Sequence, residues 1–187
     1  GTQALTVTDG TTVNLINSVG HASGITIDFG ATATAATVGM NGISTTAVSN
    51  SDVTLTGAKL ATVTINATGT ASKVALMDVA GASAITLNAN ADVTSTIATT
   101  KAKSALTVTG TGKVDLGALD ADLDTVDASA VTGTFTAQLG SQTDTVYTGS
   151  AGVDTITAGT TDALTTAHKL AVSGGAGEDT LIILDDG

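Results

Sequence analysis

Short runs in which apolar and small polar residues alternate recur along the chain, as expected for half-buried β-strands. One series comprises residues 52–55, 73–76, 92–95, 113–116 and 134–136. Its apolar markers, which are 21, 19, 21 and 21 positions apart, are Val53, Val74, Val93, Val114 and Phe135. This near-constant step predicts equivalent strands of a repeating structure, which should stack in register in one sheet.

A second series lies between the members of the first. It comprises residues 62–65, 84–87, 105–108 and 125–127. Its markers, which are 22, 21 and 20 positions apart, are Val63, Ile85, Leu106 and Val126. Two interleaved series with one period predict two strands in each coil of about 21 residues, and a second sheet.

A single coil of this kind cannot bury its apolar residues, whereas a stack of parallel coils can. We therefore expect an all-β fold, a right-handed parallel β-solenoid (β-roll or β-helix). An antiparallel sandwich would show similar alternation, but the constant spacing favours the solenoid. The same pattern occurs at 5–8, 13–15 and 25–27, whereas the register is lost between about 30 and 50, where we expect an irregular coil or loop.

Composition restricts the classes of partner. The formal net charge is −11, and the basic residues are all lysines, which argues against nucleic acid or an anionic membrane as partner. There is no cysteine for a disulfide or a thiolate metal site. The sequence has no run of about 18 apolar residues, so it predicts no membrane-spanning helix. No signal peptide is recognisable, and we expect the chain to be a segment of a longer protein.

From about residue 139 the chain becomes rich in glycine and aspartate. Residues 174–182 read GGAGEDTLI and match the nine-residue pattern G-G-x-G-x-D-x-U-x at every fixed position. Residues 149–157 read GSAGVDTIT and depart from the pattern only at Ser150. Two degraded copies, at 140–147 and 159–162, contribute Asp144 and Asp162.

Glycines in such a turn allow positive φ and direct successive carbonyl oxygens to one side, and the aspartate adds a charged oxygen. Ca²⁺ takes about six to eight oxygen ligands, more than one turn supplies, so two stacked turns are needed. We expect the turn at 149–154 to pair with that at 174–179, and 140–144 with 159–162. The candidate Ca²⁺ ligands are Gly149, Ala151, Gly152, Asp154, Gly174, Ala176, Gly177, Asp179, Asp144 and Asp162.

The glycine–aspartate motifs resemble the repeats of the RTX family, bacterial proteins secreted by type I systems whose motifs form a Ca²⁺-filled parallel β-roll. The preceding Thr/Ala/Val-rich coils resemble the solenoids of RTX-type surface-layer (S-layer) proteins and adhesins. We accordingly divide the chain into solenoid coils at 1–139 and an RTX-like β-roll at 140–187 that continues the same solenoid. The resemblance implies secretion to the cell surface, Ca²⁺-dependent folding and self-association into a lattice, with cell-surface polysaccharide as a candidate mediator. The aspartate spacings of 10 and 25 depart from the multiples of nine expected for the family.

Other candidate sites are weaker. Asp120, Asp122 and Asp124 begin like an EF-hand loop, but Thr125 and Val131 stand where that loop needs glycine and glutamate. A solvated acidic turn and an additional weak Ca²⁺ site both remain open there. Thr-x-Thr runs occur in both strand series and skip coils, so β-propensity explains them better than an ice-binding face does.

Catalytic motifs are missing from the sequence. His21 and His168 lack partners at metal spacing, and the single glutamate, Glu178, excludes an H-E-x-x-H zinc site. No G-x-S-x-G sequence occurs. We expect a structural Ca²⁺-binding segment of an S-layer lattice without enzymatic activity. The alternative is an adhesin stalk or a ligand-binding module.

Overall fold

The computed structural model describes residues 3–7, 12–17, 24–44, 52–139, 145–158 and 170–184, and these contain strands but no helix. One set of strands comprises β1 (Gln3–Thr6), β3 (Ile25–Asp28), β5 (Asp52–Thr56), β7 (Ser72–Asp78), β9 (Val93–Ala98), β11 (Val114–Ala118), β13 (Phe135–Gln138), β15 (Asp154–Ala158) and β17 (Thr180–Ile183). The other comprises β2 (Thr12–Ile16), β4 (Ala35–Asn41), β6 (Thr62–Ala67), β8 (Ala84–Ala89), β10 (Ser104–Gly110), β12 (Leu123–Val131), β14 (Val146–Thr148) and β16 (Ala171–Ser173).

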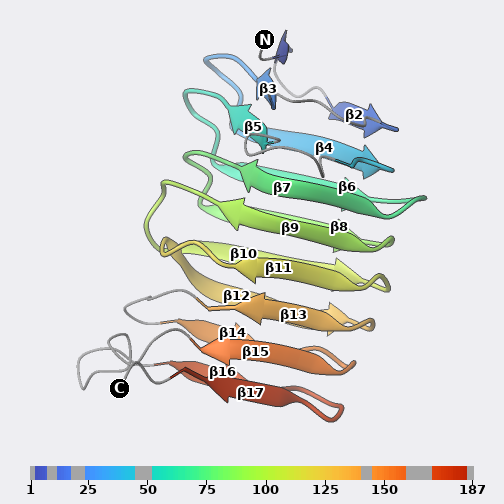
Figure 1. Ribbon diagram of the computed structural model, residues 1–187. Helices are drawn as coiled ribbons and strands as arrows, with labels where there is room; N and C mark the ends of the chain where they lie inside the picture. Colours follow the sequence, from blue (N-terminus) through green and yellow to red (C-terminus); the bar gives the residue numbers. More distant parts are fainter. Residues whose placement is uncertain are drawn as a thin grey trace.

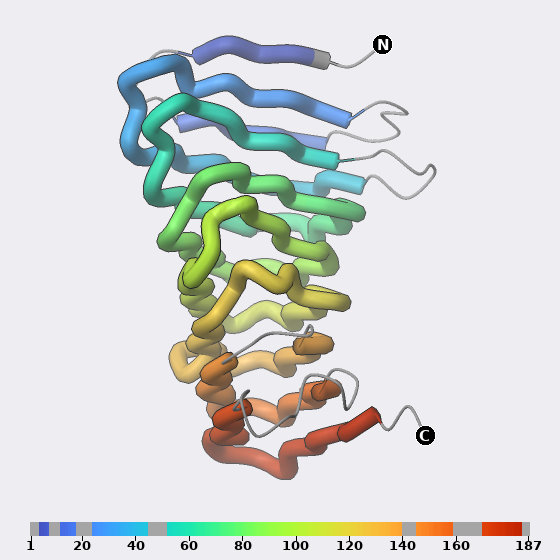
Figure 2. Tube along the Cα trace, turned by 90° about the vertical axis from the view of Figure 1, so that its left-hand side faces the viewer, coloured from blue at the N-terminus to red at the C-terminus, as the bar shows by residue number. Residues whose placement is uncertain are grey.

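The odd-numbered strands form a nine-stranded sheet and the even-numbered strands an eight-stranded sheet, each in sequence order. All the pairings between the described strands are parallel, so each coil places one strand in each sheet (Figure 1). In a view turned by 90°, the coils follow one below another from the N-terminal to the C-terminal end (Figure 2). The chain is therefore a two-sheet parallel β-solenoid, as its periodicity predicts.

The second marker series is confirmed residue by residue. Val63 pairs with Ile85, Ile85 with Leu106, and Leu106 with Val126. The column continues to Tyr147 and Val172, and its members from Val63 to Tyr147 are almost completely buried. Alternation therefore identified both the strands and their inward-facing positions.

The first series is confirmed from β9 onward but is wrong at Val74. Val93, Val114 and Phe135 are in register, whereas Val53 pairs with Met77 rather than with Val74. Strand β7 carries an extra residue between Lys73 and Leu76, a β-bulge that shifts the register of its second half. The first half of β7 lies beside Ile43 and Ser44 and only the second half beside β5, so one strand adapts to two neighbours.

The irregular coil expected between about 30 and 50 is also wrong for its central part. Strand β4 occupies Ala35–Asn41 and pairs without interruption with β2 and β6. Ala36, Val38 and Met40 point inward and are buried. The register was missed because the Cα partners of β4 and β6 are 27 residues apart, for example Ala36 and Val63, well above the mean period.

Both sheets continue across the expected boundary at 139/140, since β12 pairs with β14 and β13 with β15. The core between the sheets consists mainly of Val, Ile, Leu and Ala, together with Met40 and Met77, and its largest members are Phe29, Phe135 and Tyr147. In this stack the inward column of Val93, Val114 and Phe135 meets Asp154 in the next coil.

Candidate metal centre at two stacked turns

Two glycine–aspartate turns connect the sheets at the C-terminal end of the described stack. The first runs from Gly149 to Asp154, between β14 and β15, and the second from Gly174 to Asp179, between β16 and β17. The amide of Gly149 donates to the carbonyl of Ser173 (2.7 Å), and the amide of Ala176 donates to the carbonyl of Ser150 (3.0 Å). The second turn thus lies directly on the first, one coil farther along, in the pairing that the motif spacing predicts.

Glycine is required where these turns approach each other. Gly175 has φ of 91°, and a Cβ added there would collide with the carbonyl oxygen of Ser150. A Cβ on Gly149 would likewise collide with the carbonyl oxygen of Gly174. The glycines therefore allow direct backbone contact between the turns, with a carbonyl oxygen of each turn lying against a glycine of the other.

Asp154 occupies an apolar position in the stack but keeps a carboxylate there. Its side chain is fully buried (0 % exposed). The carboxylate accepts hydrogen bonds from the Ser150 amide (2.7 Å), the Ser150 hydroxyl (2.5 Å) and the Tyr147 hydroxyl (3.0 Å). Burying a carboxylate is costly unless it is hydrogen-bonded or paired, and these three donors offset part of that cost.

Asp179 is the equivalent residue one coil later and is exposed. Its Oδ1 accepts a hydrogen bond of 3.0 Å from the backbone amide of Asp154. Its other oxygen lies over the first glycine of its own turn, Gly174, as the carboxylate of Asp154 lies over Gly149. The two carboxylates thus have the same placement in successive turns and are joined through the Asp154 amide.

The electrostatics of this end of the molecule are one-sided. Within 145–158 and 170–184 every charged residue is acidic, namely Asp154, Glu178 and Asp179. Burial, and then the negative charge of Asp154, raise the pKa of Tyr147 far above its ordinary value of 10.0. The phenol therefore remains protonated at neutral pH and serves as a donor to Asp154.

The oxygen atoms of these turns are suitable ligands for a hard cation. Two carboxylates and the carbonyl oxygens at the contact between the turns are oxygen ligands, which Ca²⁺ prefers. A cation would also neutralise acidic charge that no basic residue balances in these two segments. The described residues contain no cluster of three or more Asp, Glu, His or Cys side chains, so backbone carbonyls would have to supply most of the ligands.

The structure brings eight of the ten sequence-predicted ligand residues into this pair of turns. They are Gly149, Ala151, Gly152, Asp154, Gly174, Ala176, Gly177 and Asp179. Asp144 and Asp162, with the second expected pair of turns, lie outside the described residues.

Sequence reasoning missed Tyr147 and Ser150 as partners of Asp154. Ser150 could have been noticed in the sequence as the one departure from the motif. Its hydroxyl donates a hydrogen bond to the carboxylate of Asp154, which a glycine at this position could not do. Tyr147 is the only tyrosine of the chain. Its ring stacks on Phe135 with centroids 5.7 Å apart, and its hydroxyl reaches Asp154.

The other acidic candidate is a local turn. The amide of Asp122 donates to the carboxylate of Asp120 (2.9 Å), an arrangement that stabilises a turn before β12. This hydrogen bond fits the acidic-turn interpretation, and it does not require a cation.

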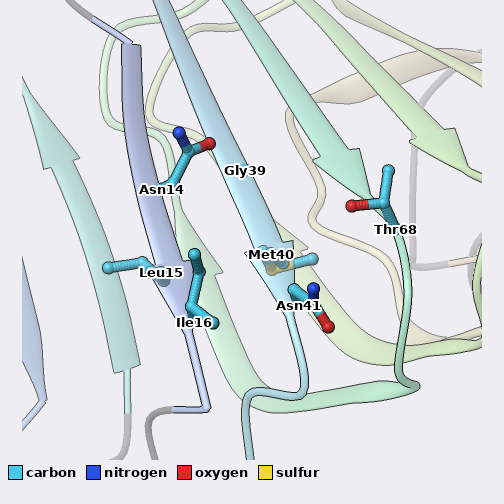
Figure 3. Close-up of a pocket in the computed structure, with 7 residues that line it drawn as sticks. All are labelled: Asn14, Leu15, Ile16, Gly39, Met40, Asn41 and Thr68. Atoms are coloured by element: carbon cyan, nitrogen blue, oxygen red, sulfur yellow. The ribbon is translucent and has the colours of Figure 1, made fainter.

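A separate hollow of about 230 Å³ lies near the N-terminal end, where β2 meets β4. It is lined by Asn14, Leu15, Ile16, Gly39, Met40, Asn41 and Thr68 (Figure 3). None of these residues is charged, and the hollow is far along the stack from the glycine–aspartate turns (Figure 1).

Comparison with known proteins identifies no relative, so the description of this candidate site rests on its geometry. No family model matches the chain, and no match is found among curated proteins or solved structures. A search of the described residues for a helix long and apolar enough to cross a membrane finds none.

Proposed function

We propose that this chain is a structural, Ca²⁺-binding β-solenoid segment of a bacterial cell-surface lattice, and that it has no catalytic role. The observation that carries the proposal is the stacking of two glycine–aspartate turns, with Asp154 and Asp179 held in equivalent positions one coil apart. A cation between these turns would bind oxygens from both, and its binding would join the last coils to each other.

Linkage of binding to folding supports this role. The site exists only when both turns are formed, so the free energy of Ca²⁺ binding adds to the stability of the folded state. The charge of the two turns adds to the need for a cation, since 145–158 and 170–184 contain Asp154, Glu178 and Asp179 but no basic residue.

The rest of the proposal concerns the setting. The stacked parallel coils form a repetitive scaffold, which suits a lattice component, and millimolar Ca²⁺ outside cells would keep the turns filled. Self-association of copies, with cell-surface polysaccharide as a candidate mediator, is part of this proposal. An adhesin stalk is the second candidate, because it requires the same solenoid and the same calcium turns but no lattice.

Tyr147 provides a probe inside the proposed site, because the chain has no tryptophan and no other tyrosine. The 187-residue chain is freed of metal with chelator and titrated with Ca²⁺. Tyrosine fluorescence, near-UV circular dichroism and calorimetry are recorded. We expect saturable heat, a change in the Tyr147 signals, and an increase in β-structure as the last coil, which contains β16 and β17, becomes ordered on the coil of β14 and β15.

Asp179→Asn tests the ligand role, because Asp179 is exposed and its replacement leaves the donors to Asp154 in place. We expect Ca²⁺ affinity to fall by at least about tenfold. Asp52→Asn, on strand β5 away from the turns, is the matched control and should bind as the parent does. Identical spectra in chelator and in millimolar Ca²⁺, with no heat of binding, would show that these turns need no cation.

A further inference from the structure

The two sheets differ in charge over the coils that precede β12, a strand of the eight-stranded sheet that carries Asp124 and Asp127. Strands β2, β4, β6, β8 and β10 of the eight-stranded sheet contain no charged residue. The neighbouring strands β3, β5, β7 and β11 of the nine-stranded sheet carry Asp28, Asp52, Lys73, Asp78 and Asp115. In a chain of net charge −11, five successive strands of one sheet are thus uncharged.

The outward positions of these five strands form aligned columns of small residues. The central column, set by the strand register, is Thr12, Thr37, Thr64, Thr86 and Thr107. On one side of it lie Asn14, Gly39, Asn66, Asn88 and Thr109. On the other side lie Ala35, Thr62, Ala84 and Ala105. We call this surface the threonine face. The Thr-x-Thr runs do not predict this surface, because its threonines follow one another from coil to coil and not along one strand.

Hydrogen bonds between coils hold the side chains of the threonine face in place. Asn88 donates to Asn66 (2.7 Å), and Thr109 donates to Asn88 (2.8 Å). The amide of Asn14 lies over Gly39 and occupies the space of the missing side chain (Figure 3). Threonine has few rotamers, so ordering this surface in a contact costs little conformational entropy.

Charge identifies the partner that this face fits. Two copies of an acidic chain repel each other unless the surfaces that meet are neutral. Contact through the nine-stranded sheet would bring carboxylates such as Asp28, Asp52 and Asp78 of both copies together. The threonine face, and the uncharged hollow at its N-terminal end, carry no such penalty.

The area is sufficient for a weak specific contact. Five strands about 4.8 Å apart and about six residues long cover roughly 24 by 20 Å, or about 480 Å² for each copy. Two faces would bury about 1,000 Å² in total, close to the lower bound for a biological interface. Such a contact is individually weak, which suits an assembly in which it is repeated.

We propose that the threonine face is the surface through which two copies of this chain pack, sheet against sheet. The inference rests on the self-association in the proposed function and assigns that association to particular residues. It is separate from the calcium turns, which lie at the other end of the stack (Figure 1).

The test introduces one charge on each sheet in turn. Thr107 on β10 and Thr94 on β9 are both exposed, outward-facing threonines within strands. Thr107→Lys places a cation in the middle column of the threonine face, at its β10 edge beside Asp127 of β12. Thr94→Lys lies between Lys73 and Asp115 on the charged sheet, so each new lysine has one acidic neighbour. Both variants change the net charge equally, so they form a matched pair. Sedimentation equilibrium of the full 187-residue chain in millimolar Ca²⁺ measures the dissociation constant.

We expect Thr107→Lys to raise the dissociation constant by about tenfold or more, and Thr94→Lys to leave it unchanged. Circular dichroism and thermal unfolding confirm that both variants fold. Equal association of both variants, or a parent chain that stays monomeric at millimolar concentration, would overturn the inference. The calcium titration with Tyr147 as probe is read on single chains at low concentration, so failure of the interface and failure of the calcium site are distinguished.

Discussion

The hydroxyl of Tyr147 donates a 3.0 Å hydrogen bond to the carboxylate of Asp154, and both side chains are buried. Tyr147 comes from the eight-stranded sheet and Asp154 from the nine-stranded sheet, so the bond crosses the core. It links the aromatic stack of Phe135 and Tyr147 to the first glycine–aspartate turn. The stability of this end of the solenoid and the proposed cation binding therefore depend on one shared polar contact.

Removal of this hydroxyl should destabilise the protein. Tyr147→Phe keeps the ring stacked on Phe135 but leaves the buried carboxylate with one donor fewer, at an expected cost of about 1–3 kcal/mol in the free energy of unfolding. Chemical denaturation in chelator measures it. An unchanged unfolding midpoint and slope would show that the two Ser150 donors satisfy Asp154 by themselves.

Alkaline pH should weaken the fold through the same residue. The pKa of Tyr147 is raised in the folded state, first by burial and then by the charge of Asp154. A raised folded pKa gives stability that is complete below the unfolded value of 10.0 and is lost as the pH rises above it.

Unfolding free energies measured between pH 8 and about 11 should therefore fall more steeply for the parent than for Tyr147→Phe. Lysines titrate in the same range in both proteins, so the difference between the two curves isolates the phenol. Parallel curves would contradict the buried, protonated phenol.

Ser150→Gly should lower the stability of the metal-free protein and increase the stabilisation by Ca²⁺. The variant loses the hydroxyl that donates to Asp154 and accepts from the amide of Gly152, while it restores the complete glycine motif. We expect lower stability in chelator, by about 1–2 kcal/mol, and a larger rise in Tm on addition of Ca²⁺ than in the parent. Differential scanning calorimetry in chelator and in Ca²⁺ measures both. A calcium-induced shift no larger than that of the parent would show that Ser150 does not substitute for the cation.

Gly175→Ala should separate the stacked turns. Gly175 combines a positive φ of 91° with close approach to the carbonyl of Ser150, so alanine is strained and also collides. Gly81 has a similar φ of 84°, but its nearest contact for an added Cβ is an ordinary 3.7 Å. Gly81→Ala is thus the control that carries the conformational strain alone, about 1 kcal/mol.

We expect Gly175→Ala to cost more than Gly81→Ala in thermal unfolding and to weaken Ca²⁺ binding, which Gly81→Ala should not change. The same calorimetric titration serves for both variants. Equal losses for the two would mean that the turns do not depend on their close contact.

The architecture and much of the candidate site could be predicted from the order of residues alone. Alternation of apolar residues is local, and its near-constant period identified the strands, their inward faces and the in-register column from Val63 to Val126. The spacing of the glycine–aspartate motifs likewise identified which two turns stack. These features can be predicted even when the coil length varies slightly, because the alternation of apolar and polar residues within a strand does not depend on the length of the coil.

Other details depend on which neighbour each strand meets, and these became visible in the folded chain. Val74 left its predicted column because β7 lies beside Ile43 and Ser44 before it reaches β5. The contact of Tyr147 with Asp154 requires two sheets to close over a shared core. The threonine face arises from residues in five successive coils. Pairing over twenty or more residues is set by the summed packing of the whole stack, which no local pattern contains.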